Sequence, residues 1–210
     1  LFDPFSPETP EALRRELASG QVGLVWLELI RGIDMRRLPD EIFRVINEER
    51  QTGGYLVGVD EVLTGSYRTG SFLFSQGRLP DPDIVTLAKG LSDMFVPFGV
   101  TLVTSEVYAT ARERNPDLVD ALERRYLNQL GSHIALNARR YAAEHDLGRH
   151  VRLVATRLRD GLNEVLRSVD YLGRMRGEVR GEGLLLCVDW PDSTPYQRSL
   201  ISSTLSERGN

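Results

Sequence analysis

An acidic pair and a lysine stand where apolar segments of the chain end. The run Tyr55-Leu-Val-Gly-Val59 continues directly into Asp60 and Glu61, and ligands of open α/β sheets bind at the carboxyl ends of strands. Lys89 follows the apolar run that begins at Pro82 and precedes a glycine. An apolar setting disfavours the charged form of a lysine and frees its amine to attack a carbonyl. The sequence therefore predicts a lysine that can form a Schiff base, and separately an acidic pair at a strand end where a ligand can bind.

Each of these residues also has an ordinary structural explanation. A lysine before a glycine is most often a helix-terminus lysine, and an acidic pair after a strand is most often a solvated strand end. Arg68 remains open between a surface ion-pair partner and a functional role. Asp60 and Lys89 lie 29 residues apart, and the presence of both favours a chemical role over the two structural explanations.

Short apolar runs alternate with amphipathic stretches along the chain, which predicts an α/β fold with a largely parallel sheet. About five strands are expected in the whole chain. The runs at 22–27 and 55–59 are expected to be central strands, buried on both faces. Between them, residues 38–47 are predicted to form a crossover helix with Pro39 in its first turn. Further strands are expected at 83–86 and 98–103.

The second half of the chain changes character. Leucines at helical spacings predict long helices over residues 117–169, with Gly148 as a break. A strand is expected at 184–188, and residues 196–205 can form a helix that Gly209 would end. We place a domain boundary near residue 150.

Composition argues against several classes of function. The formal charge of −4, from 26 basic and 30 acidic residues, leaves no basic excess for nucleic acid. The apolar runs are strand-sized, so no membrane segment is predicted. The single Cys187 excludes an internal disulfide and fits a reducing cytoplasm. The three histidines lack paired ligand spacing, so no metal site is expected.

Two segments resemble the paired motif of the class III aminotransferases of the ornithine and ω-amino acid type, which depend on pyridoxal 5'-phosphate (PLP). Val59-Asp-Glu-Val-Leu-Thr-Gly-Ser-Tyr-Arg-Thr-Gly70 is similar to D-E-V-x-T-G-x-x-R-T-G, and the segment from Asp81 to Gly90 is similar to P-D-I-x-x-x-x-K. Segments 24–32 and 179–185 are similar to flanking family strands. The resemblance spans about residues 10–208 and is strongest over 55–90.

The resemblance implies the PLP-dependent transferase fold of type I. Residues 1–150 would form part of the large PLP-binding domain, with its mostly parallel sheet, and 151–210 the start of a small α+β C-terminal domain. Lys89 would hold PLP as a Schiff base and then carry protons. Asp60 would lie against the pyridine nitrogen and keep it protonated, and Val62 would pack on the ring. Glu28 matches a motif position without an assigned chemical role.

The chain departs from the family pattern at several places. Leu63 stands where the family usually has glutamine, and Gln129 stands where a threonine reaches the cofactor phosphate of the neighbouring subunit. An upstream glycine/serine loop for the phosphate and a downstream arginine for the substrate carboxylate are missing from the 210 residues. We therefore expect either the middle portion of a longer enzyme or a split subunit, which does not transaminate by itself.

The resemblance implies a transaminase that moves an amino group between an amine or ω-amino acid and a keto acid. It also implies a homodimer or heterodimer. Two alternatives stay open. The same lysine and aspartate serve aminomutases, racemases and decarboxylases of this fold, and an aminotransferase-like chain can also be a catalytically silent subunit.

Overall fold

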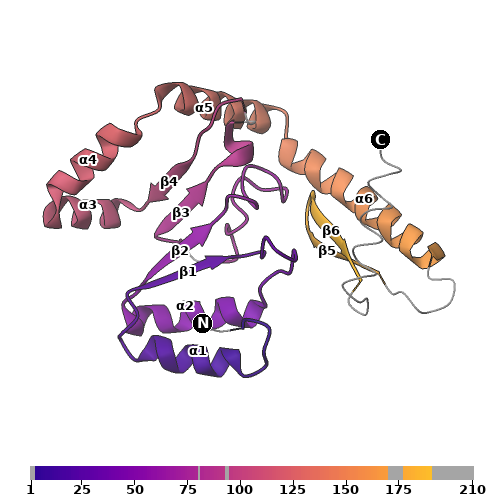
Figure 1. The fold of residues 1–210 in the computed structure, drawn as a ribbon, viewed down its shortest axis with the longest axis horizontal. Helices are drawn as coiled ribbons and strands as arrows, with labels where there is room; N and C mark the ends of the chain where they lie inside the picture. The colour runs from indigo at the N-terminus through magenta and orange to yellow at the C-terminus, as the bar shows by residue number, and fades with distance from the viewer. Residues whose placement is uncertain (1–2, 80, 93–94, 170–176, 191–210) are drawn as a thin grey trace.

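The computed structural model describes residues 3–79, 81–92, 95–169 and 177–190, and Figure 1 shows their arrangement. A four-stranded sheet has the order β1-β2-β3-β4, and a separate hairpin pairs β5 with β6. The sheet strands are β1 (Leu24–Glu28), β2 (Leu56–Asp60), β3 (Ile84–Leu87) and β4 (Val100–Val103). β1 pairs with β2 and β2 with β3 in parallel, whereas β4 runs antiparallel to β3. The predicted α/β class with a mostly parallel sheet is confirmed.

One face of the sheet is covered by helices. The crossover helix α2 (Asp40–Gly53) buries the predicted apolar stripe, although it begins after Pro39, which is its N-cap. Gly54 ends it with a left-handed φ of 66°. The helix α1 (Thr9–Ala18) lies beside α2 (Figure 1) and buries Leu17. The main apolar core joins these helices to alternate strand residues, including Leu27, Val57 and Val59.

The opposite face, called the open face below, carries the other alternate residues of β1 and β2. Its Leu24 and Trp26 are 46% and 47% exposed, and Leu56 is 37% exposed. The expectation that 22–27 forms a central strand buried on both faces is therefore wrong for the described residues, where β1 is an edge strand. A continuous apolar run predicts that both faces are suited to burial, but it does not say which layers are present.

Four helices follow the sheet: α3 (Ser105–Arg114), α4 (Pro116–Tyr126), α5 (Gln129–Glu144) and α6 (Leu147–Val169). The helical prediction for 117–169 is confirmed, whereas α3 was not predicted. The break lies before α6, where Asp146 has a φ of 45°, and not at Gly148. Gly148 has a packing role instead, because a Cβ there would lie 2.7 Å from the Gly70 carbonyl oxygen. Among the described helices, none is both long and apolar enough to span a bilayer.

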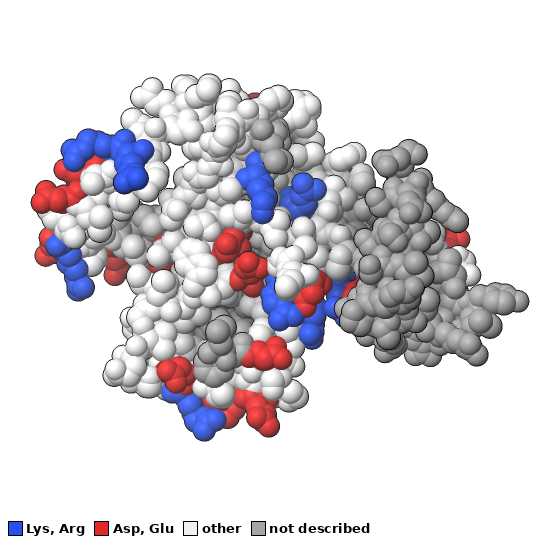
Figure 2. All heavy atoms as spheres, in the orientation of Figure 1, with Lys and Arg blue, Asp and Glu red and all other residues white. Residues whose placement is uncertain are grey.

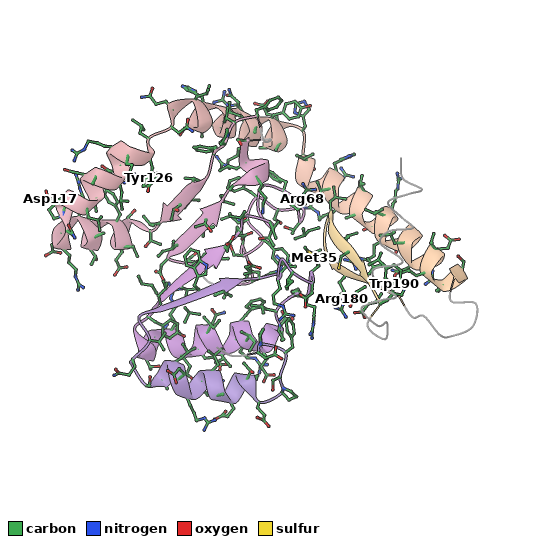
Figure 3. The ribbon with its side chains drawn as sticks, viewed as in Figure 1. Met35, Arg68, Asp117, Tyr126, Arg180 and Trp190 are labelled. Carbon is green, nitrogen blue, oxygen red and sulfur yellow. The ribbon has the colours of Figure 1, made fainter. Side chains whose placement is uncertain are left out.

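The hairpin of β5 (Glu178–Glu182) and β6 (Leu185–Asp189) contacts both α6 and the sheet's loops. Arg159 of α6 donates to the carbonyls of Val179 (3.2 Å) and Gly181 (2.7 Å). The hairpin turn reaches the loop after β2, where Leu184 N donates to Arg68 O at 2.9 Å. Figure 3 shows Arg68 on that loop, between the sheet and β6. The predicted strand at 184–188 is confirmed as β6, and the predicted helix 196–205 with Gly209 lies outside the described residues.

Candidate active site

The parallel register places three polar side chains next to one another at the carboxyl edge of the sheet. Two of them, Glu28 and Asp60, were predicted from the sequence, and the third is Thr86. Glu28 ends β1 opposite Asp60 of β2, and Asp60 is opposite Thr86 of β3. Residues in register on neighbouring strands point to the same side of a sheet, so all three lie on the open face. Lys89 is the third residue after Thr86. The edge is the one at which open α/β sheets bind ligands.

Asp60 has a fixed orientation. Its Oδ1 accepts a hydrogen bond of 2.9 Å from the backbone N–H of Val62, and its side chain is half-buried. Glu28 is more exposed, and its Oε2 accepts from the backbone N–H of Gly32 at 2.8 Å. Both carboxylates are therefore held by the turn that follows their own strand.

Lys89 is exposed and does not lie in the apolar setting that the sequence predicted. Val85 and Leu87 enter the core, but the chain turns after Leu87 into the 3₁₀ helix η1 (Lys89–Ser92). Lys89 has a φ of 52° there, in the left-handed region. An apolar run indicates where a strand is buried, but it does not indicate that the next residue leaves the core.

Lys89 lines a pocket of about 320 Å³ together with Val62. The walls come from the loop after β2, from η1, from the start of α6 and from the hairpin. The structure therefore brings Lys89 and Val62 together, whereas Asp60, Glu28 and Gln129 are not among the lining residues. Gln129 is exposed at the first residue of α5. The remaining lining residues are Leu63, Gly65, Ser66, Tyr67, Arg68, Gly90, Leu147, Val151, Leu184, Leu185 and Leu186.

Backbone strain is concentrated around this pocket. Ser66, Tyr67 and Lys89 are non-glycine residues with positive φ values of 53°, 66° and 52°, and all three line the pocket. Such residues cost roughly 1–3 kcal/mol each and cluster at functional sites. No local sequence signal indicates this strain, because serine, tyrosine and lysine are not residues that favour the left-handed region.

Glu61 has a role different from that of Asp60, a difference that sequence reasoning missed. It is 1% exposed, and its carboxylate accepts hydrogen bonds from Thr64, Phe74 and Ser75. Successive strand residues point to opposite faces, so Asp60 faces the open side and Glu61 the interior. The alternation along β2 was the available signal.

The residues at this edge fit the ring and aldehyde end of PLP. Lys89 is the only lysine of the 210 residues, so it is the only side-chain amine that could condense with an aldehyde. Within the described part of the chain, the buried hydroxyl oxygens of Ser66 and Thr86 have no hydrogen-bond partner. Unpaired buried hydroxyls are costly, and a polar ligand at this edge would give them partners.

The left-handed backbone of Lys89 can be tested through stability. Lys89→Gly and Lys89→Ala both remove the amine, but only glycine adopts φ of 52° without a Cβ clash. We expect the glycine variant to be more stable than the alanine variant by about 1 kcal/mol, measured as free energy of unfolding in urea. Ala88→Gly is the control, because Ala88 is not among the residues with positive φ, and it should destabilise. An alanine variant at least as stable as the glycine variant would contradict the strain.

Known proteins resemble this chain over most of its length. The family model Aminotransferase class-III matches residues 11–209. The adenosylmethionine-8-amino-7-oxononanoate aminotransferase of Synechococcus elongatus is 35% identical over 108 residues, which are 50% of this chain and 26% of that protein. The probable gamma-aminobutyrate transaminase 4 of Oryza sativa subsp. japonica is 32% identical over 154 residues, or 66% of this chain and 29% of that protein.

Solved structures show the same architecture. The N-acetylornithine aminotransferase of Stenotrophomonas maltophilia K279a matches with a TM-score of 0.68 and 28% identity, covering 84% of this chain and 43% of that one. A Bacillus anthracis aminotransferase matches with a TM-score of 0.79 over 99% of this chain and 48% of that one; at 20% identity it shows the fold alone.

The chain thus spans less than half the length of these solved relatives, and 26% to 29% of the two curated ones. The fold is that of the PLP-dependent aminotransferases, as the sequence resemblance implied. Because the family model extends over residues 11–209, the chain belongs to the class III aminotransferase family.

Proposed function

We propose that this chain is the cofactor-attaching part of a PLP-dependent aminotransferase that moves an amino group between an amine or ω-amino acid and a keto acid. The observation that carries the proposal is the position of the single lysine, three residues beyond Thr86 at the edge where Asp60 ends the neighbouring strand. By their names, relatives of this chain act on gamma-aminobutyrate and N-acetylornithine, which agrees with this substrate class.

Asp60, Lys89 and Val62 have separate roles in the proposed reaction. Bound PLP supplies an aldehyde that reacts with amines and a protonated ring that accepts the electron pair left when a substrate Cα–H bond breaks. The carboxylate of Asp60 holds the proton on the ring nitrogen, because a nearby negative charge favours the cationic form. The Lys89 amine attaches the cofactor and then carries the proton at Nζ. Val62 forms the wall against one ring face.

The attachment at Lys89 can be measured directly. The full polypeptide is incubated with PLP and reduced with borohydride, and its mass and peptide map are recorded. We expect one pyridoxyl group on the peptide that contains Lys89, because among these 210 residues no other side chain has a primary amine. Lys89→Arg keeps the positive charge but should lose that label. Equal labelling of wild type and Lys89→Arg would refute attachment at this residue.

Asp60→Asn tests the role of the carboxylate. The variant should still label at Lys89, but it should exchange the Cα proton of an amino donor with deuterium oxide at least about 100-fold more slowly, since the ring nitrogen loses its anionic partner. Proton NMR of the donor measures the exchange. Asp40→Asn, at the exposed start of α2, is the matched control and should exchange normally.

The same measurement separates the alternatives. A silent subunit would show no exchange in the wild type. An aminomutase, racemase or decarboxylase would exchange the proton or release carbon dioxide without transferring the amino group to a keto acid. Normal exchange by Asp60→Asn would mean that Asp60 does not act on the ring nitrogen.

We also propose that the enzyme is a dimer, as its resemblance to the family implies. The arm formed by α3 and α4 supports this, because Leu118, Leu122 and Tyr126 lie at helical spacing and are 52%, 47% and 69% exposed. Figure 3 shows Asp117 and Tyr126 at the two ends of α4, and Figure 2 shows charges of both signs on the arm.

A groove of about 1010 Å³ runs between α4 and β4 and reaches Asn128, beside Gln129. Gln129, which stands where the family's threonine reaches the phosphate of the neighbouring subunit, is the residue next to Asn128 at this groove.

Sedimentation of the full polypeptide tests this arm. The wild type should sediment as a dimer, and Leu122→Glu should dissociate it, because the substitution places a charge in an apolar contact. Arg114→Ala, at the exposed end of α3, is the control and should remain dimeric. A monomeric wild type would refute the dimer, and a dimeric Leu122→Glu variant would exclude this surface as its interface.

The domain division remains a proposal: a large domain over 1–150 and the start of the small domain over 151–210. Its support is that α6 begins at Leu147 and that Arg159 binds the hairpin. The cytoplasmic location likewise remains a prediction.

A further inference from the structure

We propose that Glu61 is a positioning residue, whose buried carboxylate holds the loop that forms one wall of the Lys89 pocket and thereby sets how tightly that pocket binds its occupant. The inference rests on the proposed function, since it takes PLP as the occupant. It concerns the loop of residues 64–75, called the wall loop below.

The carboxylate of Glu61 joins the two ends of the wall loop. Its Oε2 accepts from Thr64 Oγ1 at 2.6 Å and from Phe74 N at 3.0 Å, and its Oε1 accepts from Ser75 N at 2.6 Å. The backbone N–H of Glu61 donates to Thr86 O at 2.9 Å. One residue therefore closes the loop and fixes it to the strand that leads to Lys89.

The middle of the wall loop reaches the pocket. Ser66, Tyr67 and Arg68 line it, and the first two have left-handed backbones. Such strain persists only where the surroundings leave no relaxed alternative. Inside the loop, Ser66 N donates to Phe72 O at 2.8 Å and Tyr67 N to Ser71 O at 3.0 Å. The hydrogen bonds to Glu61 hold the two ends of this loop together.

The wall loop also has little room to move toward β3. A Cβ at Gly65 would lie 2.4 Å from Leu87 Cδ2 and 2.8 Å from Glu61 O. Gly65 N donates to that same carbonyl at 2.9 Å. Both the backbone carbonyl and the side chain of Glu61 therefore hold the loop in position.

The burial of the Glu61 carboxylate and the order of the wall loop depend on each other. Among the described ion pairs none involves Glu61, so the three loop donors are what compensate its burial. An amide at this place would turn its NH₂ group toward the N–H of Phe74 or of Ser75. Glu61→Gln therefore removes at least one hydrogen bond and leaves two donors facing each other.

The experiment measures binding separately from folding. The full polypeptide is equilibrated with a series of PLP concentrations and reduced with borohydride, and the label on Lys89 is plotted against concentration. A positioning role moves the midpoint of this curve, whereas loss of folded protein lowers its plateau. We expect Glu61→Gln to raise the midpoint about tenfold and Thr64→Val, which removes one of the three bonds, to raise it about threefold. Glu61→Asp retains the charge and should fall between wild type and Glu61→Gln.

Tyr55→Phe is the matched control. The Tyr55 hydroxyl is buried and donates to Ile46 O of α2 at 2.6 Å, and none of the described hydrogen bonds joins it to the wall loop. Its loss should lower stability without moving the midpoint. If Glu61→Gln does not fold, Thr64→Val decides the question.

Two results would overturn the inference alone: midpoints of Glu61→Gln and Thr64→Val equal to that of the wild type, or a shift of the same size in Tyr55→Phe. A wild type without label on Lys89 would overturn the proposed function and this inference together.

Discussion

The parallel register of β1, β2 and β3 is the constraint on which the candidate site depends. It places Glu28, Asp60 and Thr86 side by side and starts the turn to Lys89 from the same edge. A register slip by one residue would exchange Asp60 with Val59 or Glu61 on the open face. The buried stripe of α2, which packs on Val57 and Val59, makes such a slip costly. The core beneath the sheet thus fixes which of the two acids lies on the open face.

Asp60 and Glu61 at the end of β2 point to opposite faces of the sheet, because side chains alternate along a strand. The alternation therefore separates the proposed catalytic acid from the acid that holds the loop. Asp60 is half-buried on the open face, with one oxygen held by the Val62 N–H. Glu61 points into the interior and is surrounded by loop donors. The open face itself is apolar toward its amino end, where the Trp26 ring lies so close to Gly58 that a Cβ there would be 2.2 Å from it. That glycine lets the aromatic ring lie flat across the neighbouring strand.

The sequence predicted the elements better than their surroundings. The stripe of α2, the strand before Asp60 and the helices over 117–169 follow from side-chain periodicity, which is a local property. Whether the run at 22–27 is buried on both faces depends on layers that periodicity does not describe. Gly148 was taken for a helix break because glycine disfavours helices, but its reason is the close approach of Gly70.

For the candidate site, too, the residue identities follow from the local sequence, whereas their surroundings depend on tertiary packing. The identities of Asp60 and Lys89 followed from their order along the chain and from a family resemblance, and the register places them at one edge. The exposure of Lys89, the positive φ values around its pocket and the hydrogen bonds of Glu61 arise from tertiary packing between segments distant in sequence. No local pattern encodes them. The single lysine was visible in the sequence and is the feature that most simplifies its chemistry.

In the function proposed for this chain, Asp60 holds a proton on the ring nitrogen of a cofactor attached to Lys89. The most direct measurement is the ¹⁵N NMR shift of PLP labelled at its ring nitrogen and bound to the full polypeptide. We expect the shift of a protonated pyridine in the wild type, near neutral pH, and the shift of an unprotonated one in Asp60→Asn. An unprotonated ring nitrogen in the wild type, or the same shift in both proteins, would contradict it.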